Sequence, residues 1–323
     1  MSLGISVGLA VFLLAVAMDL MLGEPPSCIH PVVWMGRLIA LLRRHMPSSK
    51  LSGLILASIV ALLAASAGHI LVWAAGLAPL GVGPALAVIV AAYLFKSTFA
   101  VRCLLQTAEK IGNAIKGSLE QARCMLPALV GRDAGSLSRG QASSAVIESL
   151  SENYVDSILS PLFFYLLLQP AGLGLEAALA FKAISTMDSM LGYKTAELQE
   201  LGFFPARLDD LANYLPARLS IFIMALAMPG RAGAIVDVAL RDHARTPSPN
   251  SGWPMSGIAG ALGLRLEKPA YYILNDKGKE PQPSDVKKAV GFMEKAIALT
   301  LIASGLLLQV SAFFLSSGFL LQA

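Results

Sequence analysis

The sequence predicts an all-α polytopic integral membrane protein, and three observations lead to that fold class. The 323-residue chain is 55% hydrophobic and only 14% charged, and its mean hydropathy is +0.65. Soluble domains carry about 25% charged residues, so too few charges are present to cover a soluble surface. Long uncharged runs recur, and no alternating strand pattern persists. We therefore expect several transmembrane helices, with helical cytoplasmic loops that form a cytoplasm-facing cavity.

The expected spans follow the apolar runs in chain order. The first run carries only Asp19 and has no basic leader or cleavage site, which favours a retained span over a signal peptide. The stretch between Lys50 and Lys96 has no Asp, Glu, Lys or Arg, and it is long enough for two helices separated by a Gly- and Pro-rich break. The short segment 215–228 contains Arg218, which favours a re-entrant or interfacial helix. The expected spans are 2–22, 51–75, 84–101, 157–169, 175–190 and 296–320, within a single membrane-embedded domain of residues 1–323.

The polar loops between the spans are expected to face the cytoplasm, with the protein in the cell membrane. These loops are 24–50, 102–156, 191–213 and 231–295. The first of them has four Lys and Arg residues against one Glu, as cytoplasmic loops do. The net charge of +4 therefore indicates topology and anionic ligands rather than nucleic acid, because no basic stripe is interleaved with aromatic residues. Three cysteines without a C-x-x-C motif make zinc or structural disulfides an unlikely use of these residues.

The first group of candidate functional residues is acidic. Glu148, Glu152 and Asp156 are spaced i, i+4 and i+8, so a helix places them on one face, where like charges oppose each other. No Lys or Arg occurs between Arg139 and Lys182 to relieve them locally. A distant arginine, a cationic substrate or Mg²⁺ would provide the missing charge. The alternative is a solvated helix face just outside the membrane.

Two further groups follow in the chain. Lys182 and Asp188 lie in or at the end of an apolar helix, and their spacing of six does not make them face each other, so each is expected to have another partner. The pattern Asp209-Asp210-x-x-Asn213 suits a metal–phosphate arrangement, with arginines on either side. Acids are equally common in the first turn of an ordinary helix, and the sequence leaves both interpretations open.

The fourth group is the loop Ser248-Pro-Asn250-Ser-Gly-Trp253-Pro, which follows Arg241, His243 and Arg245. Its small residues can expose backbone N–H groups to a phosphate or carboxylate. Asn250 adds an amide, and Trp253 adds a flat face for a large ring system. The alternative is an ordinary tight loop. Motifs for a nucleotide-binding P-loop or a zinc protease are absent from the sequence.

At these residues the chain resembles the CobD/CbiB family of cobalamin biosynthesis, adenosylcobinamide-phosphate synthases, over nearly its whole length. Several motifs in order carry the resemblance: Asp19-x-x-x-Gly23-Glu24-Pro25, His30-Pro31-Val32-x-x-Met35-Gly36-Arg37, Gly131-Arg132-Asp133, Glu148-Ser-Leu-x-Glu152-Asn153-x-x-Asp156, Thr186-x-Asp188-Ser189-Met190-x-Gly192-Tyr193, Ala206-Arg207-Leu208-Asp209-Asp210-x-x-Asn213-x-x-Pro216-x-Arg218 and Ser248-Pro249-Asn250-Ser251-Gly252-Trp253-Pro254. Two positions depart from the family pattern, since Ser185 replaces a frequent Asn and Met255 a frequent Glu.

The resemblance implies an enzyme that joins adenosylcobyric acid to an aminoalcohol phosphate, either (R)-1-amino-2-propanol O-phosphate or ethanolamine phosphate. The product is adenosylcobinamide phosphate, ATP and Mg²⁺ are required, and the corrinoid is a substrate rather than a prosthetic group. Other implied partners are the lipid bilayer and late membrane enzymes of the same pathway, with no nucleic acid. A transporter for an anionic compound and a non-catalytic membrane sensor resembling AmpE are the alternatives.

Together, the residues and the resemblance define the candidate site. The acids are not divided between metal ligands and general base. Candidate catalytic residues are Glu152, Asp188, Asp209 and Asp210. Candidate metal ligands are Glu148, Glu152, Asp156, Asp188 and Asp209. Candidate substrate-binding residues are His30, Arg37, Arg132, Asn153, Lys182, Tyr193, Arg207, Asn213, Arg218, Arg245, Ser248, Asn250 and Trp253.

Overall fold

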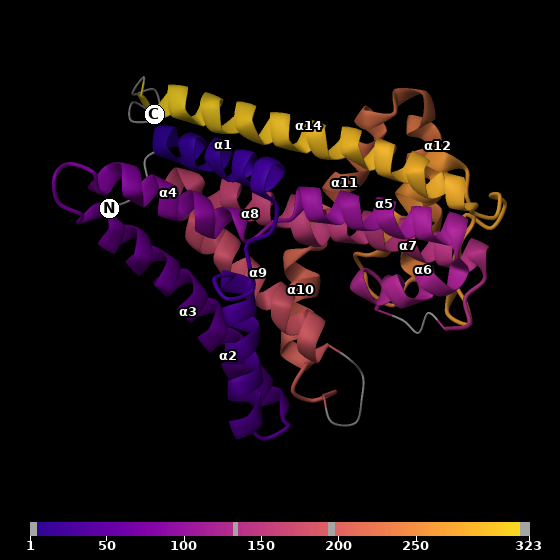
Figure 1. Ribbon diagram of the computed structural model, residues 1–323, viewed down its shortest axis with the longest axis horizontal. Helices are drawn as coiled ribbons and strands as arrows, with labels where there is room; N and C mark the ends of the chain where they lie inside the picture. The colour runs from indigo at the N-terminus through magenta and orange to yellow at the C-terminus, as the bar shows by residue number, and fades with distance from the viewer. Residues whose placement is uncertain (1–4, 132–134, 193–197, 317–323) are drawn as a thin grey trace. The chain divides into compact units, whose positions relative to one another are not determined.

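The computed structural model describes residues 5–131, 135–192 and 198–316, and their secondary structure is helical apart from one short hairpin. Figure 1 shows the elements in chain order. The all-α prediction is confirmed. The chain divides into two compact units, which are described one at a time.

The first unit comprises residues 1–100, 160–212 and 302–323. Its core forms where α3 packs against α4, α9 and α10, and where α1 packs on α4 and α8 on α9. Gly53 of α3 permits one of these close approaches, because a side chain there would collide with the backbone carbonyl of Leu201. The helices of this unit are α1 (Ile5–Leu22), α2 (Pro31–His45), α3 (Lys50–Gly76), α4 (Gly83–Lys96), α8 (Ser160–Leu168), a 3₁₀ turn (Gln169–Ala171), α9 (Gly174–Leu191) and α10 (Phe203–Ala212).

The second unit comprises residues 101–159 and 213–301. Its central helix is α13, which packs against α12, α11 and α7, while α5 covers α7. The helices of this unit are α5 (Val101–Gly117), α6 (Leu119–Met125), α7 (Arg139–Tyr154), α11 (Tyr214–Ala227), α12 (Ala232–Asp242) and α13 (Gly252–Leu262), with 3₁₀ turns at Leu126–Ala128, Pro229–Arg231 and His243–Arg245 and a π turn at Val155–Leu159. The last helix, α14 (Pro283–Ser316), belongs partly to each unit.

Three helical stretches among the described residues are long and apolar enough to cross a membrane. They are Lys50–Gly76, Gly83–Gly117 and Pro283–Phe313. A fourth crossing is added if the pair Phe203–Ala227 and Pro229–Arg245, bent by 112°, counts as one span. This bend follows α11, where the sequence predicts a re-entrant or interfacial helix over 215–228. Length and composition thus support a polytopic membrane protein.

The expected loop 231–295 is helical, as predicted, but it also contains a short hairpin. It holds α12, α13, the start of α14, and an antiparallel hairpin of β1 (Leu266–Lys268) and β2 (Tyr272–Leu274). Each strand has three residues, which is too short to produce the alternating pattern that identifies strands in a sequence. The hairpin was therefore missed.

Candidate functional site

Two acids of the first unit, Asp188 and Asp210, lie close enough for their charges to interact. Asp188 is in the last turn of α9, outside the three stretches that can cross a membrane, and Asp210 is in α10, which packs on α9. Burial and, to a smaller extent, the negative charge of Asp210 together raise the pKa of Asp188 to about 6. Burial and a like charge both disfavour the carboxylate, so this pair is suited to receive a cation.

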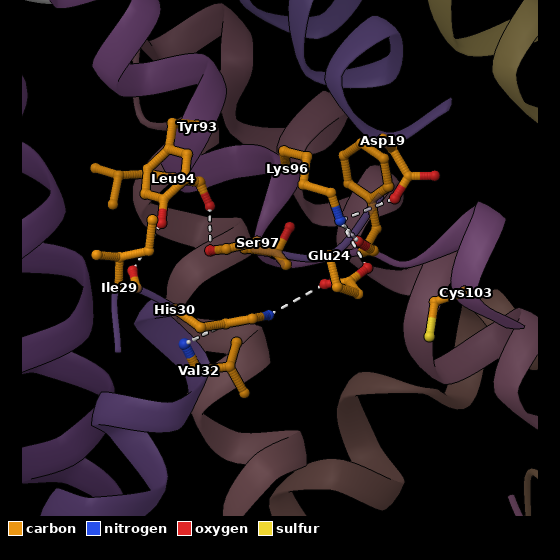
Figure 2. Close-up of polar contacts among 12 residues, drawn as sticks. Asp19, Glu24, Ile29, His30, Val32, Tyr93, Leu94, Lys96, Ser97 and Cys103 are labelled. Atoms are coloured by element: carbon orange, nitrogen blue, oxygen red, sulfur yellow. Dashed lines mark hydrogen bonds and ion pairs between the residues drawn. The ribbon is translucent and has the colours of Figure 1, made fainter. Parts of the chain in front are cut away.

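A buried lysine joins two acids elsewhere in the first unit (Figure 2). Lys96, at the end of α4, is 2% exposed, and Asp19 of α1 is fully buried. The Lys96 ammonium lies 2.9 Å from the Asp19 carboxylate and donates a 2.7 Å hydrogen bond to Glu24. It also donates to the Phe99 carbonyl at 3.3 Å. The three contacts together compensate for the desolvation of a buried ammonium group.

The loop between α1 and α2 extends this network to His30. Its Nδ1 accepts the Val32 backbone N–H at 3.2 Å, which caps α2, so in the neutral ring Nε2 carries the hydrogen and donates to Glu24 at 3.1 Å. Burial alone would raise the pKa of Glu24, but the hydrogen bonds from His30 and Lys96 outweigh it and hold that pKa below its ordinary value. His30, a candidate substrate-binding residue, therefore has a clear role in positioning Glu24.

In the second unit, an aromatic and cationic cluster surrounds Arg218 of α11. Its guanidinium lies 3.4 Å from the centroid of the Tyr214 ring and 5.0 Å from that of Trp253. The Trp253 ring stacks on His243, with centroids 4.0 Å apart and an interplanar angle of 14°. Arg218 also lies 3.4 Å from the Asn250 side-chain oxygen. The structure thus brings together three candidate substrate-binding residues, Arg218, Asn250 and Trp253, although one face of the indole already contacts His243.

The loop before α13 is ordered by its own side chains. Ser248 accepts the backbone N–H of Asn250 at 3.2 Å, and Thr246 donates to the Ser248 carbonyl at 2.9 Å. Within the part of the chain that the structure describes, the indole N–H of Trp253 and the hydroxyl of Ser256 are buried without a hydrogen-bond partner. An unsatisfied buried donor costs about 1–3 kcal/mol, so an acceptor that reaches Trp253 would be bound favourably.

Glu148 of α7 occupies a different environment from a solvated helix face. It is 3% exposed, and it accepts hydrogen bonds from Ser144 at 2.6 Å and from Tyr272 of the hairpin at 2.9 Å. Regular α-helical spacing holds from Glu148 to Glu152, but Asp156 lies in the π turn that follows α7. Such turns are frequent at functional sites. The metal-binding role of these acids stays a prediction.

The other candidate residues are dispersed over both units. Asn153 donates to the Ser149 carbonyl at 2.8 Å, and Asn213 precedes α11 and is 1% exposed. Lys182 is half-buried in α9, and Asp209 has a buried carboxylate oxygen. Arg37 and Arg207 are exposed, the latter 5.7 Å from the Phe203 ring. Arg245 lies 3.1 Å from the buried Asp242. Arg132 and Tyr193 lie outside the described residues.

Three residues that were not predicted from the sequence also belong to polar networks: Lys96, Asp242 and Tyr272. Lys96 served only to mark the end of an uncharged stretch. The signal that could have found it is a lone cation at the end of an apolar helix, which requires a partner. Within the described ranges, no group of three or more His, Cys, Asp or Glu side chains is arranged to hold a metal ion. A magnesium ion needs only one or two carboxylates when phosphate and water supply the other oxygens.

Comparisons with known proteins match the chain along most of its length. The family described as CobD/Cbib protein matches residues 12–300. A probable cobalamin biosynthesis protein CobD of Methanothrix thermoacetophila is 50% identical over 93% of this chain and 96% of the relative. A protein with the same description from Methanothermobacter thermautotrophicus is 38% identical, covering 93% and 98%. The cobalamin biosynthesis protein CobD of Klebsiella pneumoniae is 36% identical, covering 91% and 93%. No solved structure matches the chain.

Proposed function

The chain belongs to the CobD/CbiB family, and from that membership we propose that it is an amide synthase of cobalamin biosynthesis. Its substrates are adenosylcobyric acid and an aminoalcohol phosphate, either (R)-1-amino-2-propanol O-phosphate or ethanolamine phosphate. The product is adenosylcobinamide phosphate, and the reaction uses ATP and Mg²⁺. The polar loops face the cytoplasm, where ATP is available.

Amide formation from a carboxylic acid requires an activated acyl group. The carboxylate most simply attacks the γ-phosphorus of ATP, which gives an acyl phosphate and ADP. The amine nitrogen then attacks the acyl carbon, loses a proton to a nearby base and expels inorganic phosphate. The first step depends mainly on positioning the phosphates and neutralising their charge. The second needs a carboxylate within reach of the amine.

Family membership carries the proposed reaction, and the Asp188–Asp210 pair is the structural observation that supports its metal site. Two interacting carboxylates, one of them largely desolvated, fit a divalent cation because the cation removes both the repulsion and the burial penalty. Asp188, Asp209 and Asp210 would hold Mg²⁺. When bound, the ion would neutralise negative charge on the phosphate groups. When no cation is bound, Asp188 is the acid whose raised pKa suits proton exchange near neutral pH.

The cluster around Arg218 supports the binding of a large polar ring system. Arg218 offers a planar guanidinium to a carboxylate, phosphate or amide carbonyl. The indole N–H of Trp253 is buried with no acceptor among the described residues, and a corrinoid amide side chain carries suitable oxygens. Asn250 beside them can both donate and accept. These three residues would orient the corrinoid edge.

A coupling assay tests the proposed function. Purified protein in detergent, given adenosylcobyric acid, ATP, Mg²⁺ and each aminoalcohol phosphate, is expected to form adenosylcobinamide phosphate, detected by mass spectrometry. Omission of ATP or Mg²⁺ should stop the reaction. Transport of intact substrate into vesicles, without any coupling in the same preparation, would instead identify a transporter and reject the proposal.

A further inference from the structure

The hairpin of the second unit borders an open cavity that the proposed chemistry has not used. Its volume is about 550 Å³, within the range of about 300–1,000 Å³ that is usual for small-molecule sites. The side chains that line it include Arg245, Glu267, Lys268, Tyr271 and Tyr272. The cavity is therefore large enough for a phosphorylated metabolite, and it presents two cationic side chains to it.

The charges around the cavity favour an anion. Glu267, the acid in its lining, already forms a 2.8 Å ion pair with Arg265. Arg245 contacts the carboxylate of Asp242, but it does not have that carboxylate to itself. Asp242 also accepts two hydrogen bonds from Arg241, at 3.0 and 2.8 Å. Arg241 has a second acid nearby, because Asp276 lies 3.9 Å from it, whereas the acid that Arg245 contacts is shared with Arg241.

Lys268 is the second cation, and it lies over an aromatic ring. Its ammonium lies 5.0 Å from the centroid of the Tyr271 ring. Tyr271 is 71% exposed at the tip of the hairpin, beside Ala270, whose φ of +65° turns the chain there. An ammonium group over an exposed ring remains available to a phosphate, which binds it far more strongly than the ring does.

The walls of the cavity are held in place before any ligand arrives. Tyr272 donates to Glu148 at 2.9 Å, and the backbone N–H of Glu267 donates to Ser144 at 2.8 Å, so both strands are tied to α7. Arg245 donates to the Ile273 carbonyl at 3.0 Å, which ties β2 to the 3₁₀ turn after α12. A preformed site loses little conformational entropy on binding.

We propose that the cavity lined by Arg245, Lys268 and Tyr271 binds the phosphate group of a phosphorylated substrate. This inference rests on the proposed function, which supplies two such molecules, the aminoalcohol phosphate and ATP. Arg245 and Lys268 contact the phosphate oxygens. Tyr271 covers the remainder of the ligand.

Calorimetric titration of the full-length protein tests the proposal without requiring turnover. The titrants are inorganic phosphate, the aminoalcohol phosphate and a non-hydrolysable ATP analogue. Lys268→Gln is expected to weaken binding of one phosphorylated substrate about 10- to 100-fold, which is the effect of losing a charge-assisted hydrogen bond. Lys277→Gln, in an exposed lysine of the same segment outside the cavity lining, serves as the matched control and should bind like the unmodified protein.

The outcomes separate this inference from the proposed function. Selective weakening of the aminoalcohol phosphate or of the ATP analogue supports the cavity and identifies which molecule occupies it. Equal binding of all three titrants by Lys268→Gln and Lys277→Gln, or a loss confined to inorganic phosphate, overturns it. If the ligands bind with the expected selectivity but the coupling assay yields no amide, the cavity stands and the proposed function fails.

Discussion

Replacing Asp188 with asparagine is expected to abolish amide formation while making the folded protein more stable. The activity should fall because Asp188 and Asp210 are the acids proposed to hold the metal ion. The stability should rise because the pKa of Asp188 is about 6 in the folded protein against 3.8 as the ordinary value. A group with a raised acid pKa makes the folded state less stable as pH increases through the interval between the two values. At 1.36 kcal/mol per pKa unit, the penalty above pH 6 is about 2–3 kcal/mol.

The thermal midpoint of unfolding is measured in detergent, with circular dichroism as the signal. Thiol-reactive dyes are unsuitable because Cys28, Cys103 and Cys124 are exposed in the folded chain. The thermal midpoint of the Asp188→Asn variant should be higher than that of the unmodified protein at pH 7–8, and the difference should vanish below pH 4. Asp237→Asn replaces an exposed acid of α12 and is the control. It should change neither the rate of amide formation nor the thermal midpoint. Full turnover by Asp188→Asn would reject the metal–phosphate role, whatever its stability.

Replacing Lys96 with methionine is expected to cause a large loss of folded protein. The substitution preserves much of the side-chain volume but removes the ammonium group that donates to Glu24 at 2.7 Å and leaves that acid with the His30 ring. It also removes a 2.9 Å ion-pair partner of the fully buried Asp19. Removing one partner of a buried ion pair typically destabilises a protein by about 3–5 kcal/mol, since the remaining charge stays buried.

Detergent-extracted yield and thermal midpoint measure this effect. Lys110→Met removes an exposed lysine of α5 and should leave both quantities unchanged. The double variant Lys96→Met/Glu24→Gln should be less destabilised than the sum of the two single variants, because the second change removes a charge that the first leaves unpaired. Additive effects would show that Lys96 does not act through Glu24.

Some features of the fold follow from local sequence. The uncharged run after Lys50 became α3 because a long apolar stretch with good helix formers has no other stable structure in a bilayer. Ser138 and Gln141 form the capping box that starts α7, and this pairing depends only on a spacing of three. The hairpin escaped prediction because its strands are short and are held by the hydrogen bonds Tyr272–Glu148 and Glu267–Ser144, each of which joins residues more than a hundred positions apart.

The candidate site also contains residues that the sequence identified and partners that it did not. A charge at the end of an apolar helix identified Asp188 as a functional candidate, because a charge near a membrane requires a partner. The family motif that ends at Arg218 identified that residue. The partners themselves were not predictable. Asp210 belongs to a different helix from Asp188, and nothing in the spacing of α10 indicates which of its two adjacent acids lies near α9.

The sequence alone determined that this protein is helical, membrane-embedded and a member of one biosynthetic family, because hydropathy, helix periodicity and ordered motifs are properties of consecutive residues. Only the tertiary structure decided that Lys96 joins Asp19 to Glu24, that Asp242 contacts two arginines and the backbone N–H of Asn275, and that the hairpin borders an open cavity with Arg245 and Lys268 in its lining. The physical reason is that ion pairs and hydrogen bonds depend on distances of a few ångströms between helices. Packing sets those distances, and sequence separation does not encode them.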